Sequence, residues 1–267
     1  MKRTPLLALL LIPFALACGD VGSIPPGGGG GPGGGAGPDA GPAASPRVTA
    51  GLQAIYLFNE GSGSTIYDQS LLGGLDLQVE DPASVQWMPT GGLNVTAPTL
   101  LATVGPADRL GNSCMASNAV TVEAWVRPAA VNQSGPARIV TLSDGNNSRN
   151  FTLAQDNLLL DVRARTTDTD DSGGTTVSDV TAFGANVVHL AYTRSGVDDE
   201  AQLWVDGQLA GTETLAGSFS NWDMTYRLGV ANELNGERPW RGEIYLVAVY
   251  CRSLSPGEIW QNYKAGY

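Results

Sequence analysis

Residues 119–127 read Ala-Val-Thr-Val-Glu-Ala-Trp-Val-Arg and alternate along the chain in character. Val120, Val122, Ala124 and Val126 occupy one set of alternate positions, and threonine, glutamate, tryptophan and arginine occupy the other. Because successive side chains of a β-strand point to opposite faces, this period of two predicts a strand with one apolar face. Its valine, threonine and tryptophan content also favours a strand over a helix.

The same texture continues from about residue 48 to the end of the chain, in short runs that Gly, Asn, Asp or Ser residues close. We predict further strands at residues 53–58, 138–142, 150–155, 158–165, 187–194, 201–205, 226–230 and 243–250. Asp206-Gly207 predicts a two-residue hairpin turn, because this pair readily adopts positive φ. Many short strands without intervening helices predict an all-β domain of two packed antiparallel sheets over residues 48–267.

Only the C-terminus carries a helical signal. Ser255, Pro256 and Glu258 provide an N-cap, a proline at the first helical position and an acidic residue at the third. Ile259 and Tyr263 lie four residues apart and would bury one helix face. The sequence therefore predicts one short C-terminal helix.

The N-terminus resembles a bacterial lipoprotein signal. Lys2 and Arg3 precede an apolar run at residues 6–16, which is too short for a permanent membrane span and has the length of a signal-peptide core. The Ala-Leu-Ala stretch before Cys18 resembles a lipobox, in which the chain is cut before a cysteine that becomes lipidated. We predict a signal peptide over residues 1–17 and a lipid on Cys18. The alternative is an ordinary signal peptide that leaves Cys18 as a free thiol.

Residues 22–46 consist almost entirely of glycine, proline and alanine. Apart from Ile24, such a segment has no large apolar side chain to bury and cannot offset its own ordering entropy. We predict a disordered tether over residues 18–47, with a mean span of about 30 Å. The resemblance to bacterial lipoproteins implies that Gly19, which stands where an aspartate can retain a lipoprotein at an inner membrane, is compatible with an exported protein anchored at the outer membrane or cell surface.

The formal charge is −11, and removal of Lys2 and Arg3 with the signal peptide changes it to −13. So acidic a surface does not attract nucleic acid or anionic lipid. The chain after the signal peptide has no apolar run of membrane-spanning length. The predicted contact with the membrane is therefore the N-terminal lipid.

The ordered set of strands and turns resembles the LamG-like jelly-roll domains of the concanavalin A-like lectin/glucanase superfamily. The matching pieces are residues 56–63, 68–70, 120–126, 143–144, 150–153, 189–193, 203–207, 241–244, 249–250 and 254–255. The resemblance covers nearly all of residues 50–264. It implies a jelly-roll sandwich of two antiparallel sheets.

Lipidation of Cys18 would leave Cys114 and Cys251 as an even pair in an exported protein, where disulfides persist. In the layout that the resemblance implies, Cys114 precedes the strand at 120–126 and Cys251 ends the strand at 243–250. If these strands are antiparallel neighbours, the two cysteines lie close together. We expect a disulfide, and two buried free thiols are the alternative.

Hydrolases on this fold use closely spaced carboxylates on one strand. Here Glu123 is the only acid on its strand, and His189 is the only histidine in the chain. The resemblance implies that His189 packs within the sandwich as a structural residue. We therefore predict no catalytic residues and no enzymatic activity.

The loop at residues 167–179 offers the best candidate for a metal. Asp168, Asp170, Ser172, Gly173 and Asp179 fall at positions 1, 3, 5, 6 and 12 of an EF-like calcium loop. Oxygen ligands in this pattern suit Ca²⁺, which is the one cofactor that the sequence suggests. The alternative is a solvated hairpin loop whose acidic residues favour turns.

Two tryptophans lie in polar loops, where a flat ring can stack on a sugar. Trp222 is flanked by Asn221 and Asp223, and Trp240 follows Arg238 closely. We expect these five residues to contribute to a ligand site, with the polar ones donating or accepting hydrogen bonds. The alternative is that both rings fill the core, as large aromatic side chains usually do.

These features favour a tethered, non-catalytic recognition module that binds a polysaccharide or glycoprotein. Three other functions compete with this hypothesis. An exposed apolar patch would favour a module that binds a surface protein. The lack of any pocket would favour a structural envelope protein, and a carboxylate pair in a cleft would favour a glycan hydrolase.

Overall fold

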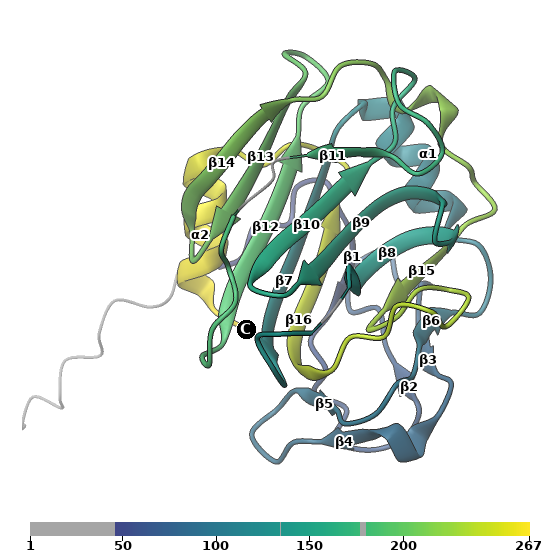
Figure 1. Cartoon of the computed structure of the whole chain (residues 1–267), viewed down its shortest axis with the longest axis vertical. Helices are drawn as coiled ribbons and strands as arrows, with labels where there is room; N and C mark the ends of the chain where they lie inside the picture. The colour runs from purple at the N-terminus through teal and green to yellow at the C-terminus, as the bar shows by residue number, and fades with distance from the viewer. Residues whose placement is uncertain (1–45, 134, 177–179) are drawn as a thin grey trace, which may run out of the picture. The chain divides into compact units, whose positions relative to one another are not determined.

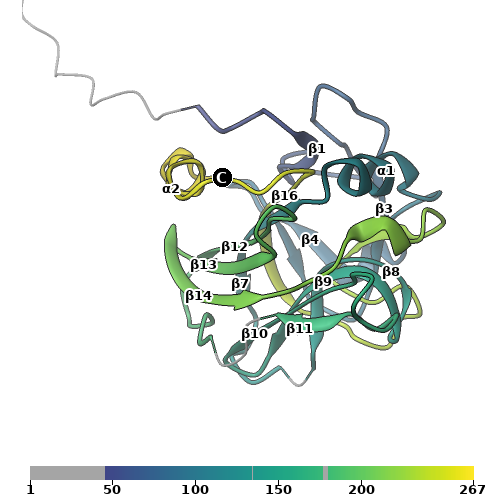
Figure 2. The same cartoon turned by 90° about the horizontal axis from the view of Figure 1, so that it is seen from above.

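The computed structural model describes residues 46–133, 135–176 and 180–267. The predicted signal peptide, Cys18 and almost all of the predicted tether lie outside these residues. The described chain forms two antiparallel sheets, named sheet A and sheet B, that pack face to face (Figures 1 and 2). The predicted all-β sandwich is confirmed.

Sheet A contains the predicted strand at residues 119–127, which is β7 (Val120–Pro128). This strand pairs with β12 (Val188–Arg194) on one side and with β16 (Gly242–Tyr250) on the other. The order of sheet A is β14 (Gln208–Thr214), β13 (Glu200–Val205), β12, β7, β16, β5 (Leu93–Val95) and β4 (Val85–Trp87), with β1 (Leu52–Tyr56) also paired to β16.

Sheet B has the order β11 (Gly174–Thr176), β10 (Leu159–Ala164), β9 (Ser148–Asp156), β8 (Ala137–Gly145), β15 (Arg227–Val230), β6 (Leu101–Thr103), β3 (Leu77–Val79) and β2 (Thr65–Ile66). All nine strands that the sequence predicted are present within these two sheets. Strands β2 to β6 and β11 were not anticipated, because two or three residues are too few to show a period of two. For β14, the sequence predicted only the hairpin turn that precedes it.

Two helices flank the sheets. Helix α2 (Pro256–Ala265) begins with the predicted capping box, in which Ser255 and Glu258 each bind the other's backbone N–H. Helix α1 (Asp108–Ser117) was not predicted, and two short 3₁₀ turns span Pro82–Ser84 and Phe219–Asn221. Neither helix is long and apolar enough to cross a membrane, and the described residues contain no other α-helix.

The predicted hairpin joins β13 to β14. Asp206 and Gly207 have φ values of 51° and 74°, as a turn with two left-handed central residues requires. The backbone N–H of Asp206 also donates to the carbonyl of His189 at 2.8 Å, and the Asp206 carboxylate accepts from the His189 N–H at 3.0 Å. The turn is therefore fixed to the neighbouring strand β12.

The main core lies between the sheets and includes the fully buried Tyr56, Phe151 and Trp240. A second apolar layer covers the other face of sheet A, where Trp125 and Trp204 pack beneath Ile259 of α2. Helix α2 lies across this face in Figure 2. Consequently β7 is buried on both faces, although only one of its faces is apolar in the sequence.

The disulfide between Cys114 and Cys251 is present. Helix α1 directly precedes β7, and β7 and β16 are antiparallel neighbours with Thr121 opposite Tyr250. The start of β7 therefore lies beside the end of β16, and the bond joins α1 to that end. The bond closes a loop across 137 positions. In the chain-entropy model such a loop contributes about 5 kcal/mol, and measured values are often smaller.

Candidate functional site

The face of sheet B that points away from the core is lined by charged and hydroxyl side chains, and we call it the polar face. Its strand residues are Arg138, Thr141, Ser143, Arg149, Thr152, Asp161 and Arg163. The loop at residues 231–241, which follows β15, adds Glu233 to this face. Gly229 permits the loop's close approach, because a Cβ there would lie 3.0 Å from Cδ2 of Leu234.

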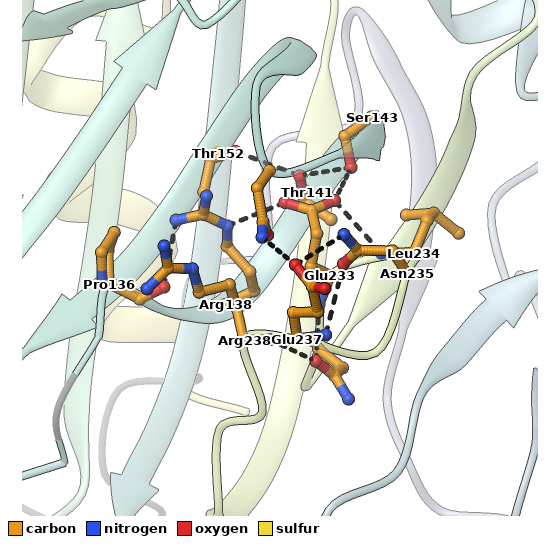
Figure 3. Close-up of polar contacts among 12 residues, drawn as sticks. Pro136, Arg138, Thr141, Ser143, Thr152, Glu233, Leu234, Asn235, Glu237 and Arg238 are labelled. Carbon is orange, nitrogen blue, oxygen red and sulfur yellow. Dashed lines mark hydrogen bonds and ion pairs between the residues drawn. The ribbon is translucent and has the colours of Figure 1, made fainter.

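A buried ion pair lies at the centre of the polar face (Figure 3). Nε of Arg138 donates to Oε2 of Glu233 at 2.9 Å, and both side chains are at most 2% exposed. Ser143 Oγ and the backbone N–H of Leu234 donate to the other oxygen of the carboxylate. Burial lowers the pKa of Arg138, and the contact with Glu233 opposes this effect. The carboxylate is thus satisfied within the protein.

A chain of hydroxyl groups extends this network along the strands. Thr141 Oγ1 donates to Ser143 Oγ at 2.9 Å and lies 3.0 Å from Thr152 Oγ1 (Figure 3). All three residues are buried. The hydroxyls therefore hold Glu233 in place.

Arg149 differs from the other arginines of the polar face because it has no ion-pair partner among the described residues. The register between β8 and β9 shifts at Ser143, which pairs with Arg149. The Arg149 side chain is 2% exposed and makes no hydrogen bond or ion pair with a described residue. Burial, reinforced by the charge of Arg138, lowers the pKa of Arg149 to about 10. The nearby Arg163, in contrast, is paired with Asp161 at 3.2 Å.

A pocket of about 600 Å³ lies at the edge of the sandwich beside this face. It is lined by Pro98, Ala130, Asn132, Gln133, Gly135, Glu237, Arg238, Pro239 and Arg241. Arg238 Nη1 donates to the Gly135 carbonyl at 3.2 Å, while its buried Nε has no partner. Arg238 was predicted as a ligand residue, and the structure places it in a polar pocket.

Gln133 joins the two loops that form this pocket. Its Nε2 donates to the Arg241 carbonyl at 2.8 Å, and its Oε1 accepts from the Arg241 N–H at 2.8 Å. The side chains of Asn132 and Arg241 themselves are exposed and make no hydrogen bond with a described residue. An amide and a guanidinium are thus held on a fixed backbone and remain free to bind a ligand.

The expectation that Trp222 offers a stacking surface is wrong. Its ring is 5% exposed and stacks on Phe219 at 4.2 Å between centroids, because it closes one end of the core. Its Nε1 donates to the Arg165 carbonyl. Asn221 Nδ2 donates to a backbone carbonyl, and the Asp223 carboxylate caps a local turn at Thr225, so both serve the fold of this loop.

Trp240 is also a core residue, contrary to its expected role. The ring is fully buried, and its Nε1 donates to Gln155 Oε1 at 2.8 Å. A buried ring has no free face for a sugar. Of the five predicted ligand residues, Arg238 alone lines one of the polar pockets described for this chain.

The predicted calcium loop is described only in part, because Asp179 lies outside the described residues. The Asp170 carboxylate accepts from the N–H and hydroxyl of Ser172, as in the predicted alternative of a turn. These bonds lower the pKa of Asp170, and the charges of Arg149 and Arg163 add to the shift. The described residues contain no cluster of three His, Cys, Asp or Glu side chains suited to a metal. The calcium site stays a prediction, and two nearby guanidinium groups oppose it.

His189 lies under helix α2 on the outer face of sheet A, not between the two sheets as expected. Its Nε2 lies 3.0 Å from Oε1 of Glu123, and both side chains are at most 1% exposed. Asn262 of α2 donates to the other carboxylate oxygen at 2.9 Å. Helix α2 therefore encloses this acid–histidine pair as part of its packing.

Sequence reasoning missed the polar face and most of the pocket. Arg138 and Arg163 were read only as parts of strands, although an arginine within a predicted strand signals a charged sheet face. Arg149 lies just before the predicted strand at 150–155 and was not considered. Asn132 and Arg241 carried no signal, since they meet through loops that are more than 100 positions apart. Residue periodicity does not report such contacts.

Residues 105–260 match the family model of the concanavalin A-like lectin/glucanases superfamily, which covers more than half of the chain. The chain belongs to this superfamily. The resemblance inferred from the ordered strands is thereby confirmed at the level of the family. No curated protein matches the chain.

Solved structures with this fold include receptor-binding domains of botulinum neurotoxins. The binding domain of neurotoxin DC in complex with rat synaptotagmin II has a TM-score of 0.57, 10% identity and coverage of 82% of this chain and 52% of its own. A structure concerning neurotoxin type C, whose cell entry depends on two ganglioside molecules, has a TM-score of 0.59 and 10% identity. The match covers 81% of this chain and 51% of the neurotoxin chain. The serotype C1 binding domain has a TM-score of 0.60 and 11% identity, and the match covers 83% of this chain and 53% of that domain. The chain spans about half the length of these structures, and the likeness shows the fold.

Proposed function

We propose that this protein is a non-catalytic recognition module that binds a carbohydrate or glycoconjugate through the pocket beside the polar face. The observation that carries this proposal is the pair Asn132 and Arg241, whose free polar side chains stand in a polar pocket of about 600 Å³. Convergent amide and guanidinium donors suit the hydroxyl and ring oxygens of a sugar. Family membership and the ganglioside dependence of one structural neighbour support the same class of ligand.

The proposed absence of catalysis rests on the carboxylates of the described residues. Glu123 and Glu233 are both buried and fully engaged in hydrogen bonds. A glycosidase needs a second carboxylate about 5–10 Å away across an accessible bond. Within the pocket, Glu237 is the one acid that lines the wall.

We further propose that the lipid on Cys18 and the glycine-rich tether hold this module at the cell envelope. The sequence of residues 1–47 supports this part of the proposal. Replacement of Cys18 by Ser should release the protein from the membrane fraction and abolish incorporation of labelled fatty acid. Retention of both properties in Cys18→Ser would contradict the anchor without bearing on the pocket.

A binding measurement tests the pocket. The purified protein is titrated with a panel of neutral and acidic polysaccharides, with calcium and again with EDTA. We expect saturable binding that Asn132→Ala and Arg241→Ala weaken by about tenfold each, the scale of one lost hydrogen bond to a charged or buried partner. Arg127→Ala is the matched control, because Arg127 pairs with Glu243 on sheet A. Binding that survives both pocket substitutions would place the ligand elsewhere.

A protein partner is the second candidate, and a specific surface favours it. An apolar pocket of about 440 Å³ is lined by Leu52, Ile55, Leu57 and Leu71, among others, and Leu71 is fully exposed. Exposed apolar surface of this kind is typical of protein contacts. If no polysaccharide binds, the wild type and Leu71→Asp are compared for binding to protein partners. Loss of a partner in Leu71→Asp would place the protein contact at this pocket.

A further inference from the structure

Arg149 is a buried cation that the described protein leaves without a partner. Its side chain is 2% exposed, and its enclosed Nε faces no hydrogen-bond acceptor. Burial of an unpaired charge is costly, and folded proteins normally supply a counter-charge or hydrogen bonds. The lowered pKa of Arg149, about 10, reflects this cost.

The acidic groups around Arg149 are already engaged. Glu233 is paired with Arg138, and Asp161 with Arg163. The polar face therefore holds three guanidinium groups and two carboxylates, which leaves one positive charge in excess. This local excess stands out on a chain whose formal charge is −11.

The adjoining loop forms no ion pair with Arg149, although the charge of Arg149 reaches Asp170. The Arg149 N–H donates to the Asp171 carbonyl at 3.0 Å, so the loop lies beside it. The Asp171 carboxylate instead contacts Arg165 at 2.8 Å, and the exposed Asp170 carboxylate binds Ser172. The neighbouring acidic groups thus have other partners.

We propose that Arg149 binds an anionic group, a carboxylate, sulfate or phosphate, of a ligand that extends from the pocket onto the polar face. The inference rests on the proposed function and narrows its ligand to an acidic glycan or glycoconjugate. An oxoanion supplies the charge and the acceptor oxygens that a guanidinium lacks here. Because so little of Arg149 is exposed, the site suits a small pendant group and not a whole sugar ring.

The test compares three proteins: the wild type, Arg149→Gln and the control Arg127→Gln. Thermal unfolding is followed in sodium sulfate and in sodium chloride at matched ionic strength. Sulfate stabilises folded proteins in general because it is excluded from their surfaces. We therefore expect sulfate to raise the midpoint of the wild type and the control by clearly more than it raises the midpoint of Arg149→Gln. Equal stabilisation of all three proteins, or none of the wild type, would overturn the inference.

A second arm separates a ligand-borne anion from a free one. Polygalacturonate carries carboxylates, and dextran is neutral. We expect polygalacturonate to bind the wild type and to bind Arg149→Gln about tenfold or more weakly. If both proteins bind polygalacturonate and dextran alike, the inference fails while the proposed function stands. If sulfate acts through Arg149 but no polysaccharide binds, the anion site stands and the carbohydrate function fails.

Discussion

Glu123 of β7 and His189 of β12 form a buried pair, 3.0 Å apart, beneath helix α2. Arg47, at the start of the described domain, also donates to Glu123, and Asn262 of α2 binds its second oxygen. One carboxylate therefore holds together the two ends of the domain and the central strands of sheet A. Burial by itself would raise the pKa of Glu123, but His189 and Arg47 outweigh it and lower the pKa below the ordinary value.

Glu123 should make the fold sensitive to acid. Since its folded pKa is lowered, its contribution is complete above the unfolded value of about 4.3 and is lost as the pH falls through the folded value. Glu123→Gln should reduce the free energy of unfolding by about 3 kcal/mol near neutral pH and flatten its dependence below about pH 4. Urea unfolding across this range measures both effects. The exposed Glu213→Gln is the control, and an unchanged acid profile in Glu123→Gln would contradict this role.

The Cys114–Cys251 disulfide should contribute strongly to stability. The double variant Cys114→Ser/Cys251→Ser should lose about 2–5 kcal/mol, because the unfolded chain regains the freedom of a loop across 137 positions. Thermal melts with and without a reductant measure the effect. The reductant should lower the midpoint of the wild type and leave the double variant unchanged. A wild type that ignores the reductant under unfolding conditions would count against the bond.

The Arg138–Glu233 pair should behave as a coupled unit. Glu233→Gln alone should cost about 3 kcal/mol, because it leaves a buried guanidinium without its counter-charge. Arg138→Met/Glu233→Gln should cost less than the sum of Arg138→Met and Glu233→Gln. A double-mutant cycle of urea unfolding measures this difference. Additive single effects would show that the two charges do not interact.

Removal of the unpaired charge at Arg149 should stabilise the protein. In chloride buffer, Arg149→Met should raise the free energy of unfolding by about 1 kcal/mol or more, since an apolar side chain of similar length has no charge to desolvate. Arg163→Met is the control and should bring no gain, because Arg163 has Asp161 as a partner. Destabilisation by Arg149→Met would indicate a partner that the contacts do not reveal.

Trp222 and Arg241 should separate stability from binding. Trp222→Ala should cost about 3–5 kcal/mol, as expected for a ring packed in the core, without a selective loss of ligand at sub-denaturing temperature. Arg241→Ala should leave the melting midpoint within the scatter of surface substitutions and weaken ligand binding. Parallel melting and binding assays measure both. The opposite pattern would restore Trp222 to the ligand site.

Local signals in the sequence predicted the local structure well. The capping box at Ser255 and the turn at Asp206-Gly207 have physical requirements that few residues meet, and both form as predicted. Helix α1 lacks such signals, since its N-cap residue Ala107 makes no side-chain cap and Gly111 interrupts its interior. Its position depends instead on packing and on the disulfide.

The candidate site was far less accessible to sequence reasoning. Trp222 and Trp240 have polar neighbours in sequence, yet both rings turn into the core, because neighbours along a loop do not reveal the direction of a side chain. The charge of Arg149 is visible in the sequence, but its lack of a partner depends on ion pairs between distant segments. Such properties become visible only in three dimensions.

We propose that this protein recognises a glycan through the pocket beside the polar face. Titration of the wild type, Asn132→Ala/Arg241→Ala and the control Arg127→Ala with the polysaccharide panel tests it most directly. We expect saturable binding by the wild type and the control, and a loss of at least about tenfold in the double pocket variant. Binding of equal strength by all three proteins, or no binding by the wild type, would contradict it.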